Sequence, residues 1–163
     1  MTISQHHLLE WMISSQKNYS ENFSIHACTD ITGFGLLGHL GEMISASNKS
    51  LSNDSRNSPL RVKLKASQIP VIEGALELIE NGYSSSLAPA NRTALRLTNS
   101  YSSFLPQVEI LFGDISEGSK RHQALLELII DPQTCGPLIV SCSPKAAVIL
   151  IQEDHWHEIG TVH

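Results

Sequence analysis

Hydrophobic and polar residues follow two different periods along the chain, and each period predicts its own kind of element. Apolar and basic residues alternate over 60–65, a period of two that predicts a strand with one solvated face. Over 33–47 the apolar residues recur at intervals of three and four, which predicts a helix with one buried stripe. The polar residues of 47–59 predict a surface loop between these two elements.

The same patterns predict the rest of the fold. Helices are expected over 4–18, 71–81, 121–129 and 144–151, and strands over 23–29, 108–112, 138–142 and 159–162. Ser4 is available as an N-cap of the first helix and Gly82 as a C′ residue of the second, whereas 83–101 is expected to be a loop with one or two helical turns. Strands separated by helices indicate the α+β class, with a mixed sheet of about four or five strands and helices packed mainly on one face.

The length and composition of the chain indicate one folded domain over residues 1–163. Apolar residues make up 41% of the sequence, which argues against global disorder, and a net charge of −5 without a basic run argues against nucleic-acid binding. No apolar run is long enough to cross a bilayer, and residues 1–10 lack the pattern of a secretion signal. We therefore expect a cytoplasmic protein without a membrane partner.

The sequence contains three cysteines, Cys28, Cys135 and Cys142, an odd number without C-x-x-C spacing. This usage fits a reducing compartment. Free cysteine is among the residue types that are most often buried, so we expect structural thiols in the core rather than ligands or nucleophiles.

Residues 26–39 carry the most informative chemistry, because they are expected to form a short strand, a glycine-bearing turn and the start of a helix. Such a turn collects free backbone N–H groups at one point, and Gly33 and Gly35 let the backbone approach an anion such as phosphate. Asp30 ends the strand beside these amides, and a carboxylate next to phosphate requires a bridging hard cation, which predicts Mg²⁺. The structural alternative is that Asp30 or Thr32 caps the helix and that the glycines permit close packing.

A second stretch, Asp-Pro-Gln-Thr-Cys-Gly-Pro-Leu at 131–138, is expected to be mainly architectural. Its Asp or Thr can satisfy free backbone amides in a turn, and Gly136 relieves a tight bend before the strand that follows. Pro137 cannot donate to a sheet ladder, so it is expected at the first residue of that strand or on a sheet edge.

These stretches resemble those of a known enzyme family. The string Ala-Cys-Thr-Asp-Ile-Thr-Gly-Phe-Gly-Leu-Leu-Gly-His at 27–39 looks like the motif that opens the carboxy-terminal half of selenophosphate synthetases (selenide, water dikinases). Residues 131–138 are similar to that family's Asp-Pro-Gln-Thr-Ser-Gly-Gly-Leu, and 69–76 resemble a third segment between them. The resemblance implies the fold of the carboxy-terminal domain of the aminoimidazole ribonucleotide synthetase-like superfamily. It also implies that selenide, ATP and water yield selenophosphate, AMP and phosphate, with ATP between two halves of the enzyme.

The resemblance further implies a site and its partners. Asp30 is expected to be the carboxylate that binds Mg²⁺, and the neighbouring residues are expected to face the ATP substrate: Thr29, Thr32, Gly33, Phe34 and Gly35. No catalytic residue is expected in this chain, because the amino-terminal half of such enzymes supplies the nucleophile and further aspartates. We therefore expect a domain that is inactive without an amino-terminal half, takes small-molecule substrates and forms a homodimer.

Two other functions are open at this point. One is the equivalent half of an aminoimidazole ribonucleotide synthetase or a hydrogenase maturation protein, whose ATP and metal sites resemble this one. The other is a non-catalytic interaction domain, because Pro137 and the serines at 84–86 depart from the glycines of the selenophosphate synthetase pattern.

Several further side chains have more than one interpretation. Arg92 is expected to pair with an acidic neighbour, with a phosphate contact as the alternative. His39 is expected to be partly buried and hydrogen-bonded. His155 and His157 have the spacing of a metal-binding pair on an extended segment, but an exposed turn is the favoured interpretation. Cys135 is assigned no role beyond that of a structural thiol.

Overall fold

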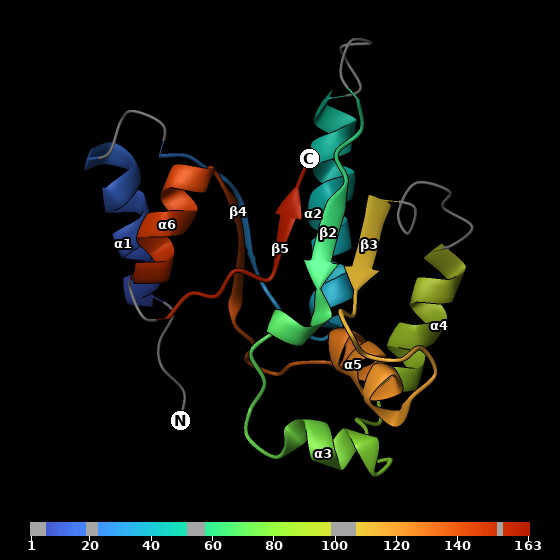
Figure 1. Cartoon of the computed structure of the whole chain (residues 1–163). Helices are drawn as coiled ribbons and strands as arrows, with labels where there is room; N and C mark the ends of the chain where they lie inside the picture. Colours follow the sequence, from blue (N-terminus) through green and yellow to red (C-terminus); the bar gives the residue numbers. More distant parts are fainter. Residues whose placement is uncertain (1–5, 19–22, 52–57, 99–106, 153–154) are drawn as a thin grey trace.

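The computed structural model of the protein describes residues 6–18, 23–51, 58–98, 107–152 and 155–163, and it has the predicted α+β architecture (Figure 1). The described helices are α1 His6–Asn18, α2 Gly35–Leu51, α3 Ala75–Glu80, α4 Ala88–Thr98, α5 Lys120–Ile130 and α6 Pro144–Gln152, with a short 3-10 helix η1 at Ala66–Gln68. The described strands are β1 Ile25–Asp30, β2 Val62–Lys65, β3 Val108–Leu111, β4 Leu138–Cys142 and β5 Gly160–Val162. None of the helices in these ranges is long and apolar enough to span a membrane.

The described strands form two sheets rather than one. β1 and β4 form an antiparallel ribbon, whereas β2 lies at the centre of a mixed sheet, parallel to β3 and antiparallel to β5. The mixed sheet is therefore confirmed, but within the described residues it has three strands and not the four or five expected. The difference has a physical reason, because a period of two marks a strand without recording which strands pair.

The mixed sheet has one buried face and one solvated face. Val62 and Leu64 of β2 are buried, whereas Lys63 between them is exposed. Figure 1 shows α2 behind this sheet, and the buried stripe of α2 belongs to the same hydrophobic cluster as Val62 and Leu64. The alternation predicted for the strand and the stripe predicted for the helix are thus confirmed.

The helix α2 is longer than the sequence predicts. It continues to Leu51, into the range expected to be a loop, and residues 52–57 of that loop lie outside the described ones. Asn48 ties this extension to the mixed sheet, because its Oδ1 accepts the Leu60 N–H at 2.7 Å and its Nδ2 donates to Gln107 Oε1 at 2.9 Å. A polar residue typical of loops therefore serves here as a helix-to-sheet connection.

Glycines set the boundaries of α3. Gly74 has a φ of +80°, so the helix begins after it, later than predicted. Gly82 has a φ of +89° and its N–H donates to Ile79 O at 2.9 Å, which confirms it as the C′ residue. The next helix, α4, covers 11 residues and is longer than the one or two turns expected within 83–101. Ser4, the predicted N-cap of α1, lies outside the described residues.

The cysteines are less buried than predicted. Cys28 and Cys135 are exposed and Cys142 is half-buried, so the expectation of core thiols is wrong for the first two. Burial alternates along β1, and Cys28 lies on the exposed side together with His26 and Asp30. Residue-type statistics do not anticipate this, because the exposure of a strand residue depends on which side of the strand meets the core.

Two segments that are far apart in the sequence pack backbone against backbone at the end of the β1–β4 ribbon. Ile31 N–H donates to Pro137 O at 2.9 Å, and Gln133 N–H donates to Thr32 O at 3.0 Å. Pro137 lies immediately before β4, next to the predicted first-residue position, and contributes its carbonyl to the contact. The geometry therefore supports an architectural role for residues 131–138.

Two glycines make this close approach possible. A Cβ at Gly136 would collide with Ile31 O, and a Cβ at Gly35 would lie 2.7 Å from the carbonyl carbon of Ile130. Gly35 also has a φ of +69°, a conformation that favours glycine. By contrast, a Cβ at Gly33 would meet no atom within 4 Å.

Replacement of Gly136 by alanine is expected to destabilise the protein by about 2 kcal/mol or more, because the methyl group would force two backbone segments apart. Urea unfolding of the purified chain measures the change. Gly33→Ala is the matched control, because its site has open space, and its change in unfolding free energy is expected to stay within about 0.5 kcal/mol. Equal stability of Gly136→Ala and the wild type would contradict the packing described here.

Candidate functional site

Asp30 is the last residue of β1, and it is exposed. The ribbon fixes its backbone opposite Leu138, and its backbone oxygen accepts the Thr29 hydroxyl at 3.3 Å. Within the described part of the chain, no hydrogen bond or ion pair engages its carboxylate. The carboxylate is therefore available to a ligand, and it does not cap α2 as the structural alternative requires.

The turn after Asp30 carries the backbone amides that the sequence indicates. Gly35 N–H donates to Thr32 O at 3.0 Å, so this amide is used inside the turn. The amides of Thr32, Gly33 and Phe34 have no backbone acceptor among the described residues, but Thr32 is half-buried. Gly33 is exposed and Phe34 is 58% exposed. Of the predicted amides, those of Gly33 and Phe34 are thus the ones that suit an anion.

A buried side-chain amide holds this turn in place. Asn91 of α4 is 7% exposed, and its Nδ2 donates to Gly33 O at 2.8 Å and to Ile130 O at 2.9 Å. One NH₂ group therefore joins the turn after β1 to the end of α5, where the second motif begins. The sequence pattern did not reveal this role. In the structure Asn91 lies three positions after the fully buried Ala88, and so on the inward side of α4.

A second polar contact supports the turn from α2. His39 is 8% exposed, its Nε2 lies 3.0 Å from Thr32 Oγ1, and its Nδ1 lies 3.2 Å from Glu42 Oε2. The Phe34 ring lies beside the imidazole at a centroid distance of 5.7 Å. The predicted hydrogen-bonded histidine is confirmed, and the Thr32 hydroxyl contacts this histidine rather than capping α2.

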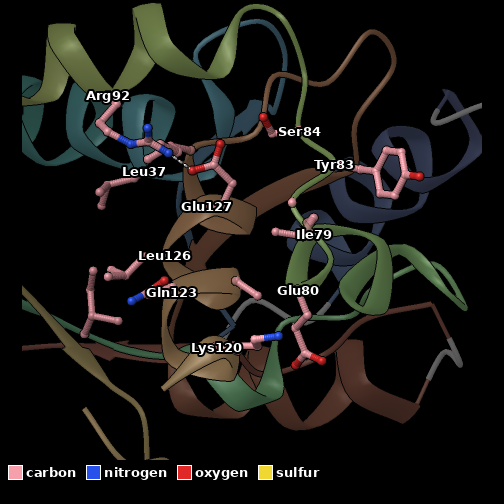
Figure 2. Close-up of a pocket in the computed structure, with 14 residues that line it drawn as sticks. Leu37, Ile79, Glu80, Tyr83, Ser84, Arg92, Lys120, Gln123, Leu126 and Glu127 are labelled. Carbon is pink, nitrogen blue, oxygen red and sulfur yellow. Dashed lines mark hydrogen bonds and ion pairs between the residues drawn. The ribbon is translucent and has the colours of Figure 1, made fainter. Parts of the chain in front are cut away.

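The structure also contains an open pocket of about 740 Å³ between α3, α4 and α5 (Figure 2). At its wall Arg92 forms an ion pair with Glu127, which confirms the predicted acidic partner. Neither Asp30 nor any residue of 32–35 lines this pocket. The predicted site and the pocket are therefore separate regions of the surface.

The histidines near the carboxyl end are exposed, as predicted. The ring of His155 lies edge-on to that of His7 at a centroid distance of 6.4 Å, and His157 is likewise exposed. Across the described ranges, no group of three or more His, Cys, Asp or Glu side chains could hold a metal ion. A metal ion at Asp30 would thus take its other ligands from water, a substrate or a partner.

Two titratable groups are affected by low solvation near the contact between the two motifs. Although Cys28 is exposed as a residue, surrounding protein atoms desolvate its thiol in part and raise its pKa, and the neighbouring Asp30 carboxylate raises the pKa further. Burial also raises the pKa of Asp131, while the hydrogen bond from Gln133 Nε2 at 2.8 Å acts in the opposite direction. The pKa of the Cys28 thiol therefore depends on the charge of Asp30, the candidate metal ligand.

The fold is that of a known class of domain. Residues 2–163 match the family described as AIR synthase related protein, C-terminal domain, and the chain belongs to this family. Among curated proteins it is similar to the selenide, water dikinase of Rhizobium meliloti, with 33% identity over 129 residues, which are 79% of this chain and 29% of that protein. The identity with the selenide, water dikinase of Pelobacter propionicus is 32% over 130 residues, which are 80% of this chain and 30% of that protein. With the selenide, water dikinase of Treponema denticola it is 28% over 146 residues, which are 90% of this chain and 33% of that protein. The predicted family resemblance is confirmed, and the chain spans about a third of the length of these relatives.

Replacement of Asn91 by alanine is expected to destabilise the protein by about 2 kcal/mol, because the part-buried Gly33 O and the buried Ile130 O would lose their shared donor. Asn81→Ala is the matched control. The Nδ2 of Asn81 also donates to a backbone oxygen, Glu77 O at 2.8 Å, but the residue is exposed and the expected change is below about 0.5 kcal/mol. If chemical unfolding shows equal losses in both variants, Asn91 does not join the two segments.

Replacement of Asp30 by asparagine is expected to speed alkylation of Cys28 at neutral pH, because loss of the carboxylate lowers the thiol pKa and raises the thiolate fraction. Mass spectrometry of iodoacetamide-treated protein follows each cysteine separately. Cys142, whose pKa is raised by burial, is the internal control and is expected to react at an unchanged rate. An unchanged rate at Cys28 would show that the two side chains do not interact.

Proposed function

We propose that the chain is the carboxy-terminal domain of an ATP-dependent selenide, water dikinase, which makes selenophosphate from selenide, ATP and water. Its family membership and its similarity to about a third of each named dikinase support this proposal. The chain contributes one Mg²⁺ carboxylate, Asp30, and a turn that faces the phosphates. The amino-terminal half of the enzyme is its partner.

The proposal depends on one observation: an exposed carboxylate lies next to two exposed amides of one turn that have no backbone acceptor in the described chain. Asp30 offers oxygen ligands to a hard cation, and the amides of Gly33 and Phe34 offer donors to phosphate oxygens. A magnesium–triphosphate presents both kinds of group. Mg²⁺ keeps several waters and is commonly held by one or two carboxylates together with substrate phosphates, so a single aspartate fits this role.

The residues at the end of β1 and in the turn have different tasks in the proposed site. Bound Mg²⁺ would neutralise charge on the phosphates. Asp30 would bind the Mg²⁺ ion, and the amides of Gly33 and Phe34 would donate to a phosphate and orient it. Thr29 acts indirectly, because its hydroxyl is bonded to the Asp30 backbone. The chain supplies neither nucleophile nor general base in this scheme, so it is expected to be inactive alone.

Exposed apolar side chains support a protein partner for this domain. Phe34 lies beside the candidate site, and Ile72 and Leu87 are also large apolar residues with most of their surface exposed. The proposed amino-terminal half, and a second copy in a homodimer, would cover such surface. The cysteine usage supports a cytoplasmic location for the complete enzyme.

Addition of Mg-ATP to the ¹⁵N-labelled chain is expected to shift the amide resonances of Gly33 and Phe34. Asp30→Asn is expected to weaken this response roughly tenfold in apparent Kd, because a charged ligand is lost. Asp114→Asn changes an exposed aspartate after β3 and is the control, with an unchanged response expected. Unchanged resonances of Gly33 and Phe34 in the wild type at millimolar Mg-ATP would refute the proposed site.

The same preparation tests whether the chain acts alone. Selenide- and ATP-dependent release of AMP is expected to be absent with the isolated chain and to appear only in the full-length protein. Turnover by the isolated chain would contradict the assignment of the nucleophile and the further carboxylates to the other half.

A further inference from the structure

Three polar side chains connect the candidate turn to solvent through one series of contacts. The Thr32 hydroxyl lies 3.0 Å from His39 Nε2, and His39 Nδ1 lies 3.2 Å from Glu42 Oε2. The His39 side chain is 10% exposed, whereas that of Glu42 is 66% exposed. His39 and Glu42 are three residues apart on α2, which places them on one face of the helix.

These contacts allow one arrangement of protons when the imidazole is neutral. An ionised carboxylate only accepts hydrogen bonds, so His39 Nδ1 must carry the proton that it shares with Glu42. Nε2 of the same ring is then an acceptor, and the Thr32 hydroxyl must donate to it. Since its proton is committed to His39, the Thr32 oxygen can only accept a further bond from a ligand.

We propose that Glu42 and His39 are positioning residues that make the Thr32 hydroxyl an acceptor for the cation side of a metal-bound nucleotide. This inference rests on the proposed function. Asp30 and Thr32 then both present acceptors, which suit the water molecules held by Mg²⁺, whereas the turn amides present donors to phosphate. The turn thereby favours the metal-bound nucleotide over the free nucleotide.

The surroundings of His39 favour a fixed tautomer. The residue is buried, with 8% of its surface exposed, and the Phe34 ring lies beside the imidazole. Glu42 is the charged group in contact with the imidazole among the described residues. A role in packing would require only that His39 fill space, whereas the positioning role also requires a protonated Nδ1, which can be measured.

The tautomer of His39 tests the inference without any ligand. Long-range ¹H–¹⁵N NMR spectra of the histidine-labelled chain, recorded where imidazoles are neutral, are expected to show a protonated Nδ1 and an unprotonated Nε2. His39→Gln assigns the signal by its loss. Glu42→Ala is expected to shift the ring toward the other tautomer, whereas the control Glu77→Ala, at an exposed position of α3, is not. A protonated Nε2 in the wild type, or no response to Glu42→Ala, would overturn the proposal.

The ligand preference is tested by the response of the turn amides to ATP with and without magnesium. Thr32→Val, which removes the hydroxyl, is expected to weaken Mg-ATP binding roughly three- to tenfold, and Thr32→Ser to restore it. Binding of ATP in the presence of EDTA is expected to be the same in wild type and Thr32→Val. Glu42→Ala changes an exposed side chain and is compared with the wild type in the same two conditions. We expect it to weaken the binding of Mg-ATP less than Thr32→Val does, and to leave the binding of ATP in EDTA unchanged.

The two proposals fail in different ways. Equal weakening of both ligands by Thr32→Val would overturn the positioning inference, because the hydroxyl would then serve the phosphate. A wild-type turn that does not respond to Mg-ATP would overturn the proposed function and the ligand preference together. In that case the tautomer measurement still decides whether Glu42 and His39 orient Thr32.

Discussion

The architecture depends on one contact, in which the backbone of the turn after β1 meets the backbone before β4 without side chains between them. Buried carbonyl and amide groups cost free energy unless they are paired, and the donors from Gln133 and Asn91 pair the turn carbonyls here. The approach leaves no room for a Cβ at Gly35 or Gly136. The glycines and the asparagine are thus parts of one constraint, although they lie in three separate segments of the chain.

The same constraint gives the turn its chemical character. The carbonyls of Thr32 and Gly33 face donors of the protein, so the turn is held from its inner side. The amides of Gly33 and Phe34 have no such backbone partner in the described chain, and the exposed carboxylate of Asp30 adjoins them. A rigid turn with paired carbonyls and unpaired amides is suited to an anion, and the carboxylate adds a place for a cation.

The candidate site offers few groups, and this matches the size of the chain relative to its relatives. The chain spans about a third of the dikinases it resembles, and Asp30 is the exposed carboxylate that ends β1 beside the turn. Under the proposed function, the domain provides a preorganised surface for one side of a metal–nucleotide, and the other part of the enzyme provides the reacting groups. The pocket around the Arg92–Glu127 pair lies apart from this surface.

Features that have one local physical cause can be predicted from the sequence. Hydrophobic burial produces the alternation over 60–65 and the stripe over 33–47, and the motif around Asp30 identified the end of a strand and the family. The division of the described strands into two sheets, the exposure of Cys28 and the double donor role of Asn91 follow from the packing of distant segments. Local periodicity records whether a position meets the core. Which group a position contacts depends on the path of the whole chain, because the fold brings together groups that no sequence pattern connects.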